Sequence, residues 1–203
     1  MPIHRARSPL EVLRRSSIGA FFRLRGAEAL GVSYYDLQRG VERGEVEQVG
    51  RGLYRLTDVE PDETETIASV AAAAPHAIVC LLSALRIHNI GTQNPSEVWI
   101  ALERTRRKPA NLPARVRIVR FSGRMLTYGV VDMRMLGVPV HVTNPARTVV
   151  DCFRYRNKIG VDVALEALRE TLRLRKASVD QIMRTAELCR ARTVVRRYLE
   201  ALP

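Results

Sequence analysis

Residues 21–58, FFRLRGAEALGVSYYDLQRGVERGEVEQVGRGLYRLTD, decide the fold of the N-terminal part of the chain. Phe22, Ala27 and Leu30 recur at the spacing of an amphipathic helix. Gly31 then ends the expected helix, because glycine adopts the positive φ that closes helices at little cost. The stretch therefore predicts a short first helix and a tight turn, with a second element directly behind them.

That second element reads as another helix with a polar outer face. Ser33 is placed to cap it, and Asp36 three residues later completes a pattern that resembles a capping box. Leu37 and Val41 are four residues apart and are expected to face inward. The side chains left mostly outward are Tyr34, Tyr35, Gln38, Arg39 and Arg43. Two helices joined by a glycine-containing turn form a helix-turn-helix.

The residues after the second helix predict a β-hairpin. Gly44 ends the helix, and two β-prone runs, 47–49 and 53–56, flank Gly50-Arg51-Gly52. The glycines let the tip turn without strain, so that Arg51 projects its charge from the tip. A helix-turn-helix followed by such a hairpin is a winged helix, the form in which this motif commonly binds DNA.

In a DNA-bound helix-turn-helix, the N-terminal half of the second helix meets base edges in the major groove. Candidates for base or sugar contact are Tyr34, Tyr35 and Gln38; candidates for phosphate contact are Arg39, Arg43 and Arg51, with Ser33 at the helix start. Arg39 can also read guanine. Two alternatives stay open. In the first, one of the two tyrosines packs against the wing instead of contacting DNA. In the second, the winged helix binds protein, because residues 1–59 hold ten arginines against seven acids, a net charge of only +3.

The whole chain is strongly basic. Its 203 residues carry 33 Lys and Arg against 21 Asp and Glu, a net charge of +12. Such a balance favours polyanionic partners, because neutralising phosphates releases counterions. A genome-wide preference for arginine is the competing explanation. The run Arg104–Arg124 has no acid, and its alternation predicts a charged sheet face that is either solvated or a second surface for DNA or an acidic protein. The residues of that possible surface are Arg104, Arg106, Arg107, Lys108, Arg115 and Arg117.

The rest of the chain predicts an α+β fold: an N-terminal winged helix-turn-helix, residues 1–59, and a mixed-sheet domain with a helical C-terminal part, residues 60–203. An acidic connector, 60–65, precedes an Ala-rich helix at 67–74 and an apolar run at 77–82 that is strand or helix. Ser83 is expected to cap a helix reaching Ile90. Strands are expected at 98–102, 116–121, 130–135 and 138–142, and helices from Asn144-Pro145, at 161–174, from Ser178 and at 190–202.

Several classes of protein are disfavoured. The N-terminus has no apolar core of a signal peptide, and Pro75 and His76 interrupt the longest apolar stretch, so we expect a cytoplasmic protein without a membrane span. Three scattered cysteines and four distant histidines predict neither a disulfide framework nor a metal site. No phosphate-binding loop or nucleophile motif is present, and Asp151 is explained by pairing with Arg147. We expect no enzyme activity and no cofactor.

Five stretches together resemble the AbiEi family, the antitoxins of AbiE toxin–antitoxin systems: ALGVS, VERGEVEQVGRGLYRL, CLLSALRIHNIGTQNPSEVWIAL, RIVRFSG and NPARTVVDCFRYRNKIGVDVALEAL. The resemblance implies a winged helix that represses its own operon by binding inverted repeats in the promoter. It also implies a C-terminal domain that counters a nucleotidyltransferase-like toxin without a stable complex, the type IV behaviour. By this resemblance the DNA contacts fall on Tyr35, Gln38, Arg39, Arg43 and Arg51. An orphan regulator without a cognate toxin remains the alternative.

Overall fold

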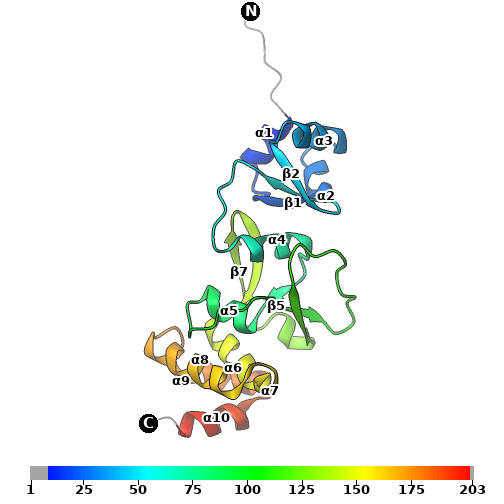
Figure 1. Ribbon diagram of the computed structural model, residues 1–203. Helices are drawn as coiled ribbons and strands as arrows, with labels where there is room; N and C mark the ends of the chain where they lie inside the picture. Colours follow the sequence, from blue (N-terminus) through cyan, green and yellow to red (C-terminus); the bar gives the residue numbers. More distant parts are fainter. Residues whose placement is uncertain (1–8, 202–203) are drawn as a thin grey trace, which may run out of the picture. The chain divides into compact units, whose positions relative to one another are not determined.

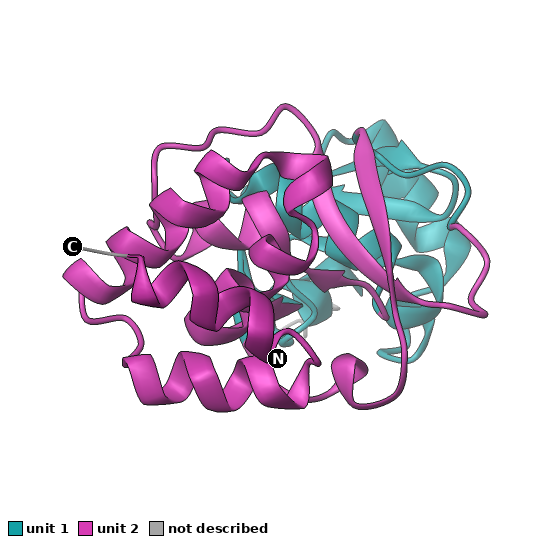
Figure 2. Ribbon diagram, turned by 90° about the horizontal axis from the view of Figure 1, so that it is seen from below, with its two compact units in different colours: residues 1–75, 109–114, 133–140 teal, residues 76–108, 115–132, 141–203 magenta. Residues whose placement is uncertain are grey.

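The computed structural model describes residues 9–201, which form two compact units (Figures 1 and 2). One unit contains residues 9–75, 109–114 and 133–140, and the other contains residues 76–108, 115–132 and 141–201. The first unit therefore extends beyond the winged helix and takes in two segments from later in the chain. The expected domain boundary after residue 59 stays a prediction.

The first unit contains the expected winged helix-turn-helix. A three-stranded antiparallel sheet has the order β1-β3-β2, and its core includes Leu37, Val46, Tyr54 and Leu56. Its elements are α1 (Pro9–Arg15), β1 (Phe21–Arg23), α2 (Leu24–Glu28), α3 (Tyr34–Glu42), β2 (Val46–Gly50), β3 (Leu53–Leu56) and α4 (Glu65–Ala73).

One expectation for the N-terminal segment was wrong, and one helix was missed. Phe22 lies in β1 rather than in the first helix of the motif, because its backbone pairs with Tyr54 of β3. The helix α1 was not expected at all, although Leu10 and Leu13 show its buried face and Pro9 occupies its first turn.

A second, mixed sheet follows the winged helix and confirms the α+β class. Its strand order is β6-β5-β4-β8-β7, with β4 antiparallel to β5 and parallel to β8, and with β5 parallel to β6. The expected turn between the last two strands sits at Leu136-Gly137, where both residues have positive φ. The strands are β4 (Ile78–Val79), β5 (Val98–Glu103), β6 (Val116–Phe121), β7 (Val130–Met135) and β8 (Val138–Thr143).

The C-terminal part of the second unit is helical, as expected. The central helix α6 contacts α5, α8, α9 and α10. Asn144 caps α6 through the Arg147 N–H, and Ser178 opens α9 with a complete capping box, so both expected caps are confirmed. The remaining elements are α5 (Leu81–Ile87), the 3₁₀ helix η1 (Gly123–Leu126), α6 (Pro145–Arg154), α7 (Arg156–Ile159), α8 (Val161–Arg173), α9 (Val179–Leu188) and α10 (Arg192–Glu200).

Ser83 is not the cap that the sequence suggested. The helix α5 begins two residues earlier, at Leu81, so Ser83 lies inside it and its Oγ accepts a hydrogen bond from the Trp99 N–H at 2.9 Å. The hydroxyl therefore joins α5 to strand β5. Among the described residues, no helix is both long and apolar enough to cross a membrane.

Candidate nucleic-acid interface

The helix α3 is held at both its start and its inner face. The Ser33 hydroxyl and backbone N–H donate to Asp36 Oδ2 at 2.6 and 3.0 Å, and the Asp36 N–H donates back to Ser33 Oγ at 3.2 Å. These hydrogen bonds from Ser33 are the main cause of a lowered pKa of Asp36. Leu37 is fully buried, and Gly40 lets α1 pack closely, since a Cβ there would lie 2.7 Å from Leu10 Cδ1. Ser33 is thus engaged in capping the helix.

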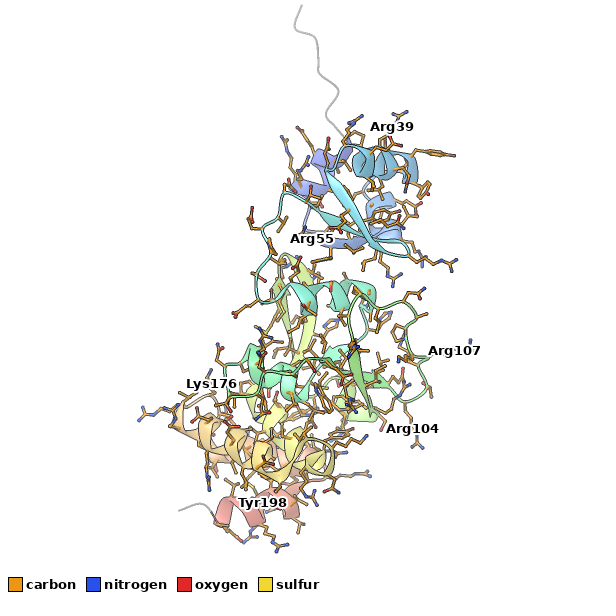
Figure 3. The ribbon with its side chains drawn as sticks, viewed as in Figure 1. Arg39, Arg55, Arg104, Arg107, Lys176 and Tyr198 are labelled. Atoms are coloured by element: carbon orange, nitrogen blue, oxygen red, sulfur yellow. The ribbon has the colours of Figure 1, made fainter. Side chains whose placement is uncertain are left out.

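The outer face of α3 carries the aromatic and cationic groups that the sequence placed there. Tyr34 and Tyr35 are 48% and 77% exposed, and their rings meet edge to face at 6.0 Å. Arg39 is exposed one helical turn after Tyr35, on the side of α3 away from the sheet (Figure 3). Gln38 is only half-buried. The structure therefore brings these four side chains together on one short helix.

Tyr34 and Gln38 lie on the side of α3 that faces the wing. Burial raises the pKa of Tyr54 on β3, Tyr34 adds to the rise, and a hydrogen bond with Gln38 opposes it. Tyr54 itself is buried and stacks on Phe22 at 6.0 Å. Strand β3 thus packs against the side of α3 that carries Tyr34 and Gln38, while both tyrosines of α3 remain largely exposed.

The wing tip projects one cation. β2 and β3 are joined by a turn at Arg51-Gly52, and the register shifts between Gln48 and Gly50. Arg51 is exposed, whereas Arg43, at the end of α3, lies 4.0 Å from the Glu45 carboxylate. Arg51 is consequently better placed than Arg43 to meet a phosphate.

Other arginines of the first unit serve its packing. Arg55 Nε lies 3.0 Å from Glu65 Oε1 of α4, and its guanidinium covers the Phe21 ring at 5.9 Å. Arg23 donates to the Ala73 carbonyl at the end of α4. Arg25 on α2 is exposed and was not among the expected contacts. Its position on the first helix of the motif, which crosses the DNA backbone in known complexes, is the signal that could have identified it.

The second basic region is a loop rather than a sheet face. Arg104, Arg106, Arg107 and Lys108 are all exposed in the segment after β5 (Figure 3). The base of this loop is held by Arg120, whose Nη1 donates to the carbonyls of Glu103 and Arg106 at 3.0 and 2.6 Å.

The expected charged sheet face does not extend along β6. Arg117 shares its face of β6 with buried Val119 and Phe121, because residues two apart on a strand point the same way. Its guanidinium lies 5.5 Å from the Trp99 ring centre, and its Nε lies 3.1 Å from Glu97 Oε2. Arg115, just before β6, is exposed. Arg117 thus covers a tryptophan and stays exposed, so its place in a second basic surface remains a prediction.

His88 and Asp151 both have structural partners. His88 Nε2 lies 2.7 Å from the Thr143 carbonyl oxygen, and burial lowers the pKa of His88. Asp151 is fully buried against Arg147. Within residues 9–201, no group of three or more His, Cys, Asp or Glu side chains is arranged to hold a metal ion.

Comparison with known proteins agrees with this architecture. Residues 11–57 match the family described as "Transcriptional regulator, AbiEi antitoxin". No curated protein sequence matches the chain. The fold is similar to the crystal structure of the RV2827C protein from Mycobacterium tuberculosis, with a TM-score of 0.58 and 15% identity over 92% of this chain and 72% of that one. At 15% identity, this similarity supports the fold and not a shared function.

Proposed function

We propose that this chain, whose residues 11–57 match the family of AbiEi antitoxin transcriptional regulators, represses its own operon by binding inverted repeats in its promoter. The observation that carries the proposal is the outer face of α3, where Tyr35 and Arg39 stand exposed on a capped and packed helix. A rigid helix that presents such groups fits the major groove, in which arginine pairs with guanine.

Three further arginines complete the proposed footprint. Arg51 at the wing tip is placed for a phosphate or the minor groove, and Arg25 on α2 for the phosphate backbone. Arg43 contributes less, because Glu45 partly neutralises it. The winged helix carries only a small net charge, so it supplies register and base readout more than electrostatic affinity.

In this proposal, the loop Arg104–Lys108 of the second unit supplies the electrostatic affinity for DNA that the winged helix lacks. Its four cations are exposed, and the two hydrogen bonds from Arg120 hold the base of the loop. Contacts of this kind are insensitive to base sequence and strongly dependent on salt. The loop is therefore assigned to non-specific attraction of DNA.

The same chain is proposed to act as the antitoxin of a type IV system, countering a nucleotidyltransferase-like toxin without binding it stably. The alternative is a regulator or protein-interaction module without a cognate toxin. One feature favours protein binding: Glu42 and Glu47, near the outer face of α3, are exposed and would repel phosphates.

A reporter placed behind the chain's own upstream region tests repression in cells. We expect the full-length protein to lower reporter output, and Arg39→Ala at equal protein level to restore it. Co-expression with the neighbouring reading frame tests the antitoxin role: growth arrest by that frame alone, relieved by this protein, supports it. Unchanged reporter output together with no effect on growth would favour an interaction module.

A further inference from the structure

The second unit contains a hollow of about 360 Å³ whose wall is unusually cationic. Three segments far apart in the sequence form it: the start of η1, the end of α6 and the link between α9 and α10. Its lining residues are Ser122, Gly123, Arg124, Met125, Arg154, Leu188, Cys189 and Arg190. Three of these are arginines, and none is acidic.

None of the three arginines forms a direct ion pair with a carboxylate. Among residues 9–201, neither Arg124, Arg154 nor Arg190 lies within 4.0 Å of a carboxylate oxygen. The nearest acids in sequence have other partners: Glu187 lies 3.5 Å from Arg192, and Asp151 lies 2.8 Å from Arg147. Asp151 interacts electrostatically with Arg154, but not at ion-pair distance. Like-charged guanidiniums around one hollow repel each other, and an anion held between them reduces that repulsion.

The site is partly organised without a ligand. Arg154 donates one N–H to the Cys189 carbonyl, which fixes its position and leaves its other N–H groups available. Arg190 follows α9 with a positive φ of 54°, and it is exposed, as are Arg124 and Arg154. Met125 and Leu188 add apolar surface beside the cations. A volume of this size lies in the range of small-molecule sites. The lining is mostly polar, which suits an anionic ligand.

We propose that this hollow binds a small molecule that carries a di- or triphosphate. Guanidinium groups form paired, charge-assisted hydrogen bonds with phosphate oxygens. A single phosphomonoester carries a charge of about −2 at neutral pH, so three arginines match a longer phosphate chain better than one phosphate. The three arginines come from separate segments around one hollow, which suits a compact ligand better than the extended backbone of duplex DNA. Met125 and Leu188 would then contact the organic part of the ligand.

Titration calorimetry on the full-length protein tests the site, with pyrophosphate, ATP and GTP as probes at constant ionic strength. The variant Arg124→Gln with Arg190→Gln removes two cations and leaves the anchored Arg154 in place. The matched control is Arg169→Gln with Arg175→Gln. It removes the same charge from exposed positions outside the hollow, and Arg175, like Arg190, has a positive φ.

We expect at least one probe to bind the wild type, the pocket variant to bind it about tenfold or more weakly, and the control to bind almost unchanged. Absence of binding for all three probes would overturn the proposal, as would equal weakening in both variants. A duplex-DNA arm separates the sources of phosphate. If only DNA affinity falls in the pocket variant, the arginines contact nucleic acid and the small-ligand assignment is wrong.

Discussion

Arg147 Nε lies 2.8 Å from Asp151 Oδ2, and both side chains are completely buried in the second unit. The guanidinium also donates to the carbonyls of Tyr128 and Met125, and it covers the Phe121 ring at 4.8 Å. One arginine thus ties the helix α6 to η1, to the segment after it and to strand β6. The other oxygen of Asp151 has no hydrogen-bond partner among the described residues.

Removing one member of this pair should strongly lower the free energy of unfolding. Arg147→Met leaves the Asp151 carboxylate buried without a cation, and two carbonyls are left without their donors. We expect a decrease of about 3–5 kcal/mol in the free energy of unfolding, measured by urea denaturation. The double variant Arg147→Met with Asp151→Leu should be destabilised by less than the sum of the two single changes. Additive effects would show that the two side chains do not stabilise each other.

The pair should also impose a pH dependence. Burial raises the pKa of Asp151 to about 6, and the nearby Arg147 opposes that rise. Because the carboxyl of the unfolded chain titrates near its ordinary value of 3.8, the folded state holds the extra proton between about pH 4 and pH 6. The free energy of unfolding should therefore fall as the pH rises through this window, by up to about 3 kcal/mol.

The measurement is the difference in unfolding free energy between wild type and Asp151→Asn from pH 4 to pH 7. The variant Arg147→Met with Asp151→Leu is a second reference that also lacks the titrating group. A wild type that becomes more stable relative to these references as the pH rises would mean that the ion pair outweighs burial.

A close glycine approach in the first unit offers a test of packing. Gly19 has a φ of +85°, and a Cβ there would lie 2.6 Å from the Gly137 carbonyl carbon. Gly31 has a similar φ of +81° but open space around it. Gly31→Ala should cost about 1–2 kcal/mol from backbone strain, and Gly19→Ala a further 1–3 kcal/mol from overlap. Equal destabilisation in thermal or urea unfolding would exclude the close approach.

Much of the fold could be predicted because its signals are local. Ser33, Asn144 and Ser178 start helices through their own side chains, and the strands from Val98 to Thr143 are bounded by turns. The errors arose where distant partners decide. Phe22 is in a strand because β3 pairs with it. Strand β1 has only three residues, which is too short to show the alternating pattern of a strand in the sequence.

The candidate site residues also differ in whether local sequence or distant partners determine their positions. Side chains on α3 and the wing could be placed from helical spacing and turn chemistry. Arg117 could not, because Trp99 and Glu97 engage it from a different strand and loop. The arginine-lined hollow was invisible for a related reason: Arg124, Arg154 and Arg190 come together only through tertiary packing.

The loop assigned to non-specific attraction can be tested by its salt dependence. Arg106→Gln with Arg107→Gln should lower the affinity for a random duplex and flatten the plot of log K against log salt, by about 0.9 for each phosphate that is no longer neutralised. The control variant Arg169→Gln with Arg175→Gln carries the same net charge. Identical slopes for the two variants would remove the loop from the DNA interface.

Arg39 on α3 is expected to provide sequence preference, whereas Arg15 on α1 is an exposed arginine outside the recognition helix. Removing an arginine that pairs with guanine costs about 1–3 kcal/mol, so Arg39→Ala should reduce preference for the correct site by about tenfold. Arg15→Ala serves as the charge-matched control and should keep that preference.

The most direct measurement is the affinity of the full-length protein for its own upstream region and for a shuffled duplex, by fluorescence anisotropy at one fixed salt concentration. We expect tighter binding to the upstream region, with that advantage reduced in Arg39→Ala and retained in Arg15→Ala. Equal affinity of the wild type for both duplexes would contradict it.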